Sequence, residues 1–153
     1  MEAKPMDAKE YAMIKRAVRI LTHLQTPIYK LTRGRVWGSL GGRDVCLVSM
    51  TGAKTGKRRT RPVMYVPSGD DVLVIGSLGG APESPVWVKN LLANPDVEIL
   101  HKGNKRQLRA RLADAEEKAR LWPTAIEHYP AYADYQARTD RDIPMFVCEP
   151  VSG

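Results

Sequence analysis

Apolar residues recur along this chain with two different periods, and the N-terminal part shows the longer one. Over residues 7–31 they return at three- or four-residue steps or multiples of them, which predicts an amphipathic helix. The apolar stripe consists of Tyr11, Ile14, Val18, Leu21, Ile28 and Leu31. Asp7 is placed to cap this helix, with Glu10 three residues later as in a capping box. Pro27 is expected to kink or split the helix.

From residue 45 onward the apolar runs are short and are separated by turns, a pattern typical of strands. The predicted strands are residues 45–50, 62–66, 72–77, 97–101, 107–113 and 145–149. Turns at 68–71 and 102–105 join neighbouring strands into hairpins. A glycine-rich connector, GSLGGRD at 38–44, precedes the first strand.

Helical segments are predicted on either side of these strands. They are an N-terminal segment within residues 1–35, a short helix at 86–93, and a segment at 114–139 that is interrupted at Pro123. Five or six mostly antiparallel strands with few long crossovers indicate a mainly β fold with flanking helices, a small closed or split β-barrel. No repeat, low-complexity tract or linker is visible, so a single domain over residues 1–153 is predicted.

Composition adds limits to this picture. With 43% hydrophobic and 27% charged residues the chain has the balance of a globular protein. No apolar run approaches the ~18 residues of a membrane-spanning helix, and the charged start lacks a signal peptide, so a cytoplasmic location is expected. Cys46 and Cys148 lie in strand-like runs and are expected to be buried reduced thiols.

The charge of the chain is unevenly distributed. Residues 1–61 carry 14 Lys/Arg against 4 Asp/Glu, a net charge of +10, whereas residues 62–153 carry 10 against 13, a net charge of −3. Nucleic acid, an anionic membrane and a small polyanion are the candidate partners of the basic part. Two interpretations of residues 7–31 stay open: a helix packed on its own domain with a solvated basic face, and peripheral contact with an anionic membrane.

The strongest positive charge lies between two predicted strands. The stretch TGAKTGKRRTR at 51–61 contains five cations, Lys54, Lys57, Arg58, Arg59 and Arg61. Glycines let backbone N–H groups approach an anion, and the cations suit phosphate or clustered carboxylates. The stretch is not a P-loop, because its spacing differs and its flanks are strands. Few aromatic residues are available to stack on bases, so nucleic acid is not the expected partner.

Two further segments suit a flat ligand. Glycines and prolines surround Ser77 within residues 75–91, and Trp87 and Asn90 follow on the short helix. Three tyrosines at three-residue intervals, within 129–135, are expected to form an aromatic wall with three hydroxyls. Plain packing is the alternative for both segments. No nucleophile–base pair is evident, and a site without its own chemistry usually borrows that of a cofactor.

Three blocks carry a resemblance to a known family. TGAKTGKRRT, SLGGAPESPVWVKNLLANP and WPTAIEHYPAYADYQARTDRDIPMFVCEP together resemble the deazaflavin-dependent nitroreductase family of actinobacteria, including mycobacteria. The resemblance implies a split β-barrel like those of flavin reductases and pyridoxamine-phosphate oxidases. It implies an F420H2-dependent reductase that transfers a hydride from the deazaflavin C5 to a quinone, an enone or a nitro compound.

The resemblance also implies the site residues. The basic loop is expected to hold the phosphate and oligoglutamate tail of coenzyme F420, and the later segments are expected to line its ring. The implied cofactor-binding residues are Ala53, Lys54, Thr55, Arg58, Arg59, Thr60, Arg61, Pro62, Val63, Met64, Ile75, Gly76, Ser77, Leu78, Val86, Trp87, Val88, Lys89, Asn90 and Tyr132. The implied substrate wall consists of Ser77, Tyr129, Tyr132, Tyr135 and Met64.

Three positions depart from the family pattern. Ala53 stands where arginine is frequent, Leu78 replaces the lysine of SKGG, and Met64 replaces a tyrosine that faces the substrate. The changes at 64 and 78 leave coenzyme binding expected but weigh against nitro reduction. The alternatives are an FMN-binding split-barrel oxidoreductase, a non-catalytic deazaflavin carrier, and a basic membrane-surface protein.

Overall fold

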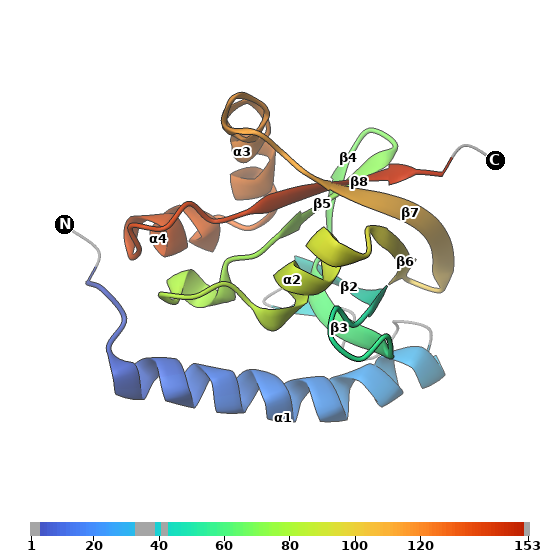
Figure 1. Ribbon diagram of the computed structural model, residues 1–153, viewed down its shortest axis with the longest axis horizontal. Coiled ribbons are helices and arrows are strands. Elements are labelled where there is room, and N and C mark those ends of the chain that lie inside the picture. The colour runs from blue at the N-terminus through green and yellow to red at the C-terminus, as the bar shows by residue number, and fades with distance from the viewer. Residues whose placement is uncertain (1–3, 33–38, 41–42, 152–153) are drawn as a thin grey trace.

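The computed structural model describes residues 4–32, 39–40 and 43–151 (Figure 1). The elements are α1 Ala8–Thr32, β1 Ser39–Leu40, β2 Arg43–Thr51, β3 Arg58–Met64, β4 Val66–Ser68, β5 Asp71–Ile75, the 3₁₀ helix η1 Leu78–Gly80, α2 Val86–Ala93, β6 Asp96–His101, β7 Asn104–Leu112, α3 Ala115–His128, α4 Ala131–Ala137 and β8 Met145–Pro150. Part of the predicted connector at 38–44, and the end of the predicted helical segment at 33–35, lie outside the described residues.

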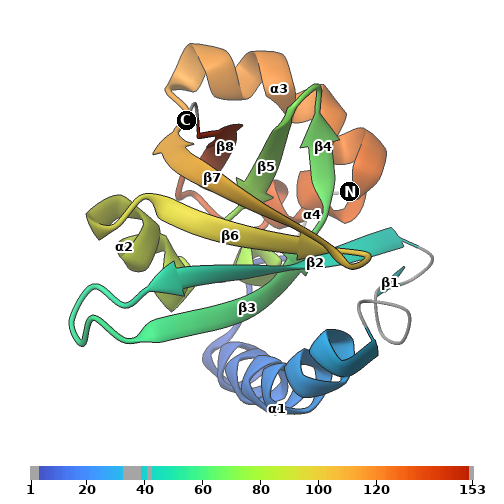
Figure 2. The same ribbon diagram turned by 90° about the vertical axis from the view of Figure 1, so that its right-hand side faces the viewer.

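The described strands form one antiparallel sheet of eight strands. Its order is β1-β2-β6-β7-β8-β5-β4. β3 pairs with β2 along the edge opposite to β6. β3 and β4 follow one another in the chain but stand at opposite edges, so the sheet curls round toward closure (Figure 2). This curled antiparallel sheet with flanking helices agrees with the predicted mainly β architecture.

The prediction of five or six strands was too low. Residues 62–66 were expected to form one strand, but the chain breaks at Tyr65 into β3 and β4. The Tyr65 N–H donates to the carbonyl oxygen of Asp44 at 2.9 Å, in register with the β2–β3 pairs, whereas from Val66 onward the chain pairs with β5 instead. β3 also begins at Arg58, four residues earlier than predicted, because its basic first half pairs with the end of β2.

Apolar side chains alternate between the two faces of the sheet and build two clusters. On one face Phe146 and Cys148 of β8 pack with Cys46 and with Trp87 and Leu91 of α2. Both cysteines are buried and unbonded, which confirms their prediction, and burial raises the pKa of the Cys148 thiol to about 12.

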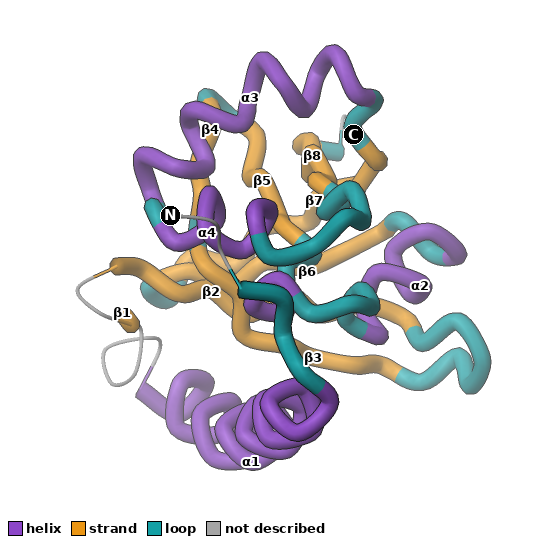
Figure 3. Tube along the Cα trace, turned by 90° about the vertical axis from the view of Figure 1, so that its left-hand side faces the viewer, coloured by secondary structure: helices purple, strands orange, loops and turns teal. Residues whose placement is uncertain are grey.

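The second cluster lies on the other face of the sheet, under α3 and α4. It contains Met145 and Val147 of β8, Ile75 of β5, and Ala125 and Tyr132 of the covering helices. Figure 3 shows α4 between α3 and the N-terminal part of α1. This face therefore carries the tyrosines that the sequence singled out.

The two interior prolines leave their helices unbroken, contrary to prediction. α1 continues past Pro27, and α3 continues through Pro123. An interior proline removes one backbone hydrogen bond, while the turns on either side stay bonded. In α3, Trp122 and Ala125 also pack on the second cluster and hold the helix in place.

The N-terminal half of α1 is fixed to the rest of the molecule. The predicted cap is confirmed, since the Glu10 N–H donates to Asp7 Oδ1 at 2.8 Å. Tyr11 Oη donates to Glu83 Oε2 at 3.0 Å, beyond η1. The Glu10 carboxylate pairs with the guanidinium of Arg138, just after α4, at 2.7 Å. α1 also runs alongside β3 (Figures 1 and 2).

The C-terminal half of α1 does not bury the predicted stripe. Tyr11 and Ile14 are half-buried, but Val18, Leu21 and Leu31 are exposed, Leu31 to 86%. The reason is that the contacts with η1 and α4 involve only the first turns. None of the helices in the described part of the chain is long and apolar enough to span a membrane.

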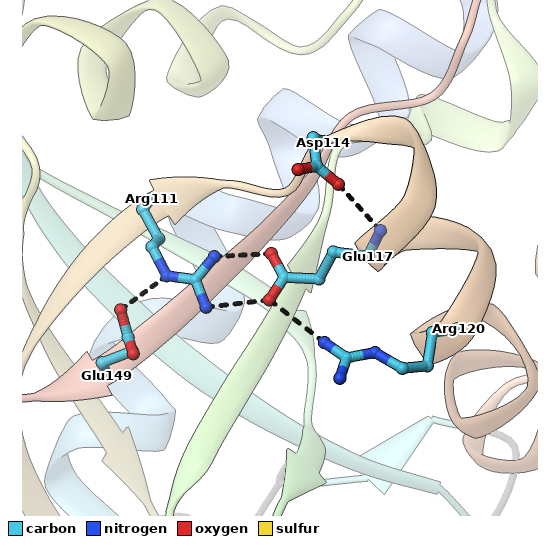
Figure 4. A network of polar contacts seen from close by, with 5 residues as sticks. All are labelled: Arg111, Asp114, Glu117, Arg120 and Glu149. Atoms are coloured by element: carbon cyan, nitrogen blue, oxygen red, sulfur yellow. Dashed lines mark hydrogen bonds and ion pairs between the residues drawn. The ribbon is translucent and has the colours of Figure 1, made fainter.

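A polar network fastens α3 to the sheet (Figure 4). Arg111 of β7 donates to Glu149 of β8 at 2.6 Å and, through Nη2, to Glu117 of α3 at 2.9 Å. The Glu117 N–H donates to the helix cap Asp114 at 2.8 Å, and Arg120 lies 3.5 Å from the Glu117 carboxylate. Because Glu149 alternates with Met145 and Val147 along β8, this network lies on the same face of the sheet as the second cluster and fastens α3 there.

Candidate functional site

The basic stretch forms a tight loop at the tip of the β2–β3 hairpin. The Gly52 N–H donates to the Lys57 carbonyl at 2.8 Å, and the Gly56 N–H donates to the Gly52 carbonyl at 3.0 Å. Thr55 Oγ1 accepts from the Lys57 N–H at 3.2 Å. Gly56 has φ +67°, which favours glycine. The loop is therefore ordered by its own backbone and leaves Lys54 and Lys57 exposed.

Strand alternation divides the arginines of β3 between two faces. Arg58 pairs with Glu98 of β6 at 2.9 Å, and the Glu98 side chain is only 18% exposed. Arg59 and Arg61 point to the opposite face. Burial, followed by the charge of Arg59, lowers the pKa of Arg61. Within the described chain Arg59 has no carboxylate partner, so the predicted cation cluster separates into a neutralised and an unpaired part.

A buried asparagine ties the basic loop to α2. Asn90 Oδ1 accepts from the Ala53 N–H at 2.9 Å, and Asn90 is 9% exposed. Trp87, predicted to line the ring, is buried in the first cluster, with its ring centroid 6.2 Å from that of Phe146. Val88 is buried as well, whereas Val86 and Lys89 are exposed. α2 thus contributes Asn90 as a polar support of the loop.

Residues 75–84 run between α2 and α4. They include the residues predicted to line the deazaflavin ring, and we call them the ring segment. A Cβ on Gly76 would lie 2.8 Å from both Pro144 Cγ and Val88 Cγ2, and a Cβ on Gly80 would lie 2.6 Å from the Tyr135 carbonyl oxygen. Neither glycine can therefore carry a side chain without displacement. The segment joins the loop-bearing half of the site, which lies beside α2, to the tyrosine-bearing half.

Two residues within this segment have unusual surroundings. Ser77 is 8% exposed, and Leu78 has φ +44°. A left-handed backbone is uncommon for a branched residue and costs free energy. The surrounding contacts therefore hold the segment in a conformation that Leu78 alone would not adopt.

The three tyrosines do come together. Tyr129 Oη and Tyr135 Oη are 3.0 Å apart, and the ring of Tyr132 meets that of Tyr129 edge-on at 4.9 Å. Burial raises the pKa values of Tyr132 and Tyr135. Met64 packs against the same cluster. The phenols of Tyr132 and Tyr135 are therefore held protonated at neutral pH, beside the hydroxyl of Tyr129.

The wall is not built on one helical face as predicted. Tyr129 is the C-cap of α3, and only Tyr132 and Tyr135 belong to α4. The turn between the helices, with Tyr129 at φ −147°, brings the first tyrosine to the other two. The three-residue spacing correctly predicted that the tyrosines come together. They meet across the turn between α3 and α4 rather than on one helical face.

Two residues that contact the site were missed. Glu98 neutralises Arg58, and its only sequence signal is a cross-strand position opposite Ser49. Arg141 bonds to the ring segment, and it is the one cation in residues 139–150, flanked by Asp140 and Asp142. Among the described residues no group of three His, Cys, Asp or Glu is placed to hold a metal ion.

Comparison with known proteins identifies the family. Residues 21–150 match the family model described as F420H(2)-dependent quinone reductase. An F420H(2)-dependent quinone reductase of Mycobacterium tuberculosis is 41% identical over 132 residues, which are 83% of this chain and 88% of that protein. A solved F420-H2 dependent reductase (FDR-A) is 40% identical, with a TM-score of 0.65 over 69% of this chain and 93% of that one.

More distant structures share only the fold. HutZ, the heme storage protein from Vibrio cholerae, is 15% identical with a TM-score of 0.52, over 83% of this chain and 90% of that one. These likenesses confirm the predicted split-barrel fold, and the family description confirms the predicted F420-dependent oxidoreductase class and its cofactor. The chain belongs to the F420H(2)-dependent quinone reductase family.

Proposed function

We propose that this chain reduces a quinone, with F420H2 as the hydride donor. The observation that carries the proposal is the arrangement around residues 75–80, which lie between a loop with exposed cations and a wall of three tyrosines. A cofactor with an anionic tail and a flat redox ring needs these two surroundings side by side.

The residues present fit the coenzyme. Lys54, Lys57 and Arg59 are exposed at the hairpin tip, and within the described chain none of them pairs with a carboxylate. We propose that they hold the phosphate and the carboxylates of the tail, with Thr55 beside them. Among the described strands β3 is bonded to β2 alone, along one edge, and α1 runs beside it. A tail with several charges explains a cluster of cations better than the single phosphate of FMN.

The chemistry of the reduced coenzyme is the donation of a hydride to an acceptor. A quinone that takes up a hydride also needs one proton to become a hydroquinone, and the chain must place a donor near the acceptor oxygen. The Tyr129–Tyr135 hydroxyl pair, the Tyr132 hydroxyl and Ser77 are polar groups of the proposed wall. Since burial raises the pKa of Tyr135, we propose that its hydroxyl stays protonated and polarises the quinone oxygen.

The apolar side of the wall favours a conjugated ring. Met64, Ile75 and Tyr132 belong to one apolar cluster and carry no charge. An enone shares the flat shape and the single acceptor oxygen of a quinone, so it remains the second acceptor class that we propose. A nitro group has two oxygens that develop charge, and the site lacks a cation at Leu78 to meet them, so we expect slower nitro reduction.

We also propose that α1 rests on the anionic inner face of the cell membrane, which makes this a cytoplasmic, peripheral protein. Six large apolar side chains in the described part of the helix are exposed: Met13 to 66%, Val18 to 41%, Ile20 to 50%, Leu21 to 53%, Leu24 to 54% and Leu31 to 86%. The exposed cations Lys15, Arg16 and Arg19 lie on the same helix. Apolar and basic side chains together suit an anionic lipid surface better than water.

Vesicle co-sedimentation tests the membrane proposal. We expect the wild type to bind vesicles that contain anionic lipid more strongly than neutral vesicles, and Leu24→Glu to bind less. Leu112→Glu is the matched control, because Leu112 is 50% exposed on β7, away from α1. Equal binding by Leu24→Glu and the wild type would refute the contact.

The enzymatic proposal is tested by ligand titration followed by turnover. Fluorescence titration with oxidised F420 and with FMN, at low and high salt, should show salt-sensitive binding of F420 alone. Stopped-flow oxidation of F420H2 should then be faster with a quinone than with an enone or a nitro compound. Preferred binding of FMN would indicate a flavin enzyme. Tight binding of F420 without turnover on any acceptor would indicate a carrier.

A further inference from the structure

Arg141, in the loop between α4 and β8, bonds to the ring segment through four hydrogen bonds. Its Nε donates to the Ala81 carbonyl and its Nη2 to the Ser77 carbonyl, each at 2.7 Å. Its Nη1 donates to the Gly76 carbonyl at 3.3 Å and to Ser84 Oγ at 3.2 Å. Three of the four acceptors are main-chain carbonyls, so this side chain fixes the path of the backbone rather than another side chain.

The backbone that carries Arg141 is itself held in place. Gln136 donates to the Arg141 carbonyl at 2.8 Å, and its Oε1 accepts from the Ile143 N–H at 3.1 Å and from Lys118 Nζ at 3.0 Å. No carboxylate among the described residues pairs with Arg141. A half-buried cation without a counter-ion needs other partners, and the negative ends of the carbonyl dipoles supply them.

These hydrogen bonds determine which way the neighbouring amides point. The described chain contains no cis peptide, and in a trans peptide the N–H points opposite to the C=O. Because the Gly76 and Ser77 carbonyls face the guanidinium, the N–H groups of Ser77 and Leu78 point away from it. The same bonds offset the cost of the left-handed Leu78 backbone.

We propose that Arg141 is a positioning residue for hydride transfer, holding the backbone of residues 76–81 in the conformation that lines the reacting ring. The inference rests on the proposed function, because it takes the ring to lie along this segment. A displacement of about 1 Å at a reacting centre reduces the rate by roughly 100-fold. The tail, in contrast, binds at the β2–β3 loop, which Arg141 does not contact. Loss of Arg141 should therefore lower kcat much more than coenzyme affinity.

Three variants test the proposal kinetically: Arg141→Ala, Arg141→Lys and the control Arg106→Ala. Arg106 is also half-buried and donates to a main-chain carbonyl, that of Asp70 at 2.6 Å, but outside the site. For Arg141→Ala we expect a fall in kcat of at least about tenfold, with the Kd of oxidised F420 changed less than about threefold. Arg141→Lys should keep part of the rate, and millimolar methylguanidine should restore part of it to Arg141→Ala. Arg106→Ala should keep the wild-type kcat.

Hydrogen–deuterium exchange of the ligand-free protein supplies a readout that does not depend on activity. The backbone amides of residues 76–84 should exchange faster in Arg141→Ala than in the wild type. In Arg106→Ala their exchange rates should equal those of the wild type. Unchanged exchange in Arg141→Ala, or an unchanged kcat in an active preparation, would overturn the proposal. A wild type that binds no F420 would instead refute the proposed function, and the exchange result would still decide whether Arg141 holds the segment.

Discussion

The separation of Arg58 from Arg59 leads to a prediction about which cation binds the coenzyme tail. Arg58 already pairs with Glu98 at 2.9 Å, whereas Arg59 points to the other face of the hairpin. A Cβ on Gly52 would lie 3.8 Å from Arg59 Cγ, so the stem of Arg59 lies along the loop. We expect Arg59→Gln to weaken the binding of oxidised F420 and Arg58→Gln to leave it nearly unchanged.

Coulomb's law gives the size of the effect. Two unit charges about 6 Å apart, at an effective dielectric constant between roughly 40 and 80, interact by about 1 kcal/mol. That free energy corresponds to roughly a fivefold change in Kd. In Arg58→Gln the charge is lost on the far face of the hairpin, where solvent ions screen it from the tail, and Glu98 keeps Lys105 as a partner at 3.9 Å, so the change in Kd should stay below about twofold. Glu98→Gln frees the charge of Arg58. Arg58 lies across the hairpin from the proposed tail site, at a separation near the Debye length of about 8 Å, so the freed charge should strengthen binding only slightly.

The assay is a fluorescence titration of the four proteins at about 0.05 M and 0.5 M salt. Added salt screens exposed charges, so the difference between wild type and Arg59→Gln should shrink at the higher concentration. Circular dichroism controls for folding. Equal loss of affinity in Arg58→Gln and Arg59→Gln would show that the pairing with Glu98 does not divide the cations in solution, and the reasoning would be refuted.

Four other changes follow from the contacts. Asn90→Leu removes the acceptor of the Ala53 N–H and should cost about 1 kcal/mol of unfolding free energy in urea titration while weakening F420 binding severalfold; Asn90→Asp keeps the acceptor and should restore most of that stability. Gly76→Ala places a Cβ against Val88 and Pro144 and should cost about 1–3 kcal/mol in the same assay, whereas Ala at exposed Gly69 should cost about 1 kcal/mol. Hydrogen bonding by Arg111 lowers the pKa of Glu117, so Glu117 stabilises the fold above its unfolded pKa of about 4.3 and loses this contribution as pH falls through its folded pKa; Glu117→Gln should cost about 1 kcal/mol at pH 7 and nothing near pH 2. Tyr135→Phe should lower quinone turnover by about 10-fold to 100-fold in stopped-flow, with little change in the Kd of F420, and unchanged turnover would remove Tyr135 from the chemistry.

Local patterns predicted those parts of the fold whose signals lie within a few residues. α2 has its predicted bounds because an apolar face ends at Asn94-Pro95, and Asp114 caps α3 through the Glu117 N–H. The start of β3 was missed because Arg58 and Arg59 have no local preference for a strand. Only pairing with Met50 and Thr51 of β2 extends them. The effect of Pro123 was overestimated because the packing of α3 on the second cluster, which the sequence does not display, can outweigh a lost backbone hydrogen bond.

The candidate site also has a part that local sequence predicts and a part that depends on long-range contacts. The cationic loop is local, since the contacts that shape it join Gly52, Thr55, Gly56 and Lys57, and it was recognised from composition and spacing. The contacts of Arg141 span 57 to 65 residues and that of Glu98 with Arg58 spans 40. No period or motif marks such pairs, because their partners are chosen by the curl of the sheet.

This division has a consequence for how specificity is built. In the proposed arrangement the loop binds the charged tail of the coenzyme, so changes there should alter turnover with all acceptors together. The tyrosine wall and Met64 belong to the second cluster, which also contains Ile75. Gly76 lies against Val88 of α2, and Gly80 lies against Tyr135 of α4. In the proposed arrangement the segment therefore separates the coenzyme from the wall, and the side chains of the wall do not hold the coenzyme tail. Substitutions at Met64 or Tyr129 should therefore change the ratio of kcat/KM between quinone and enone while leaving the Kd of F420 in place. A change of that ratio by Lys54→Ala would contradict the separation.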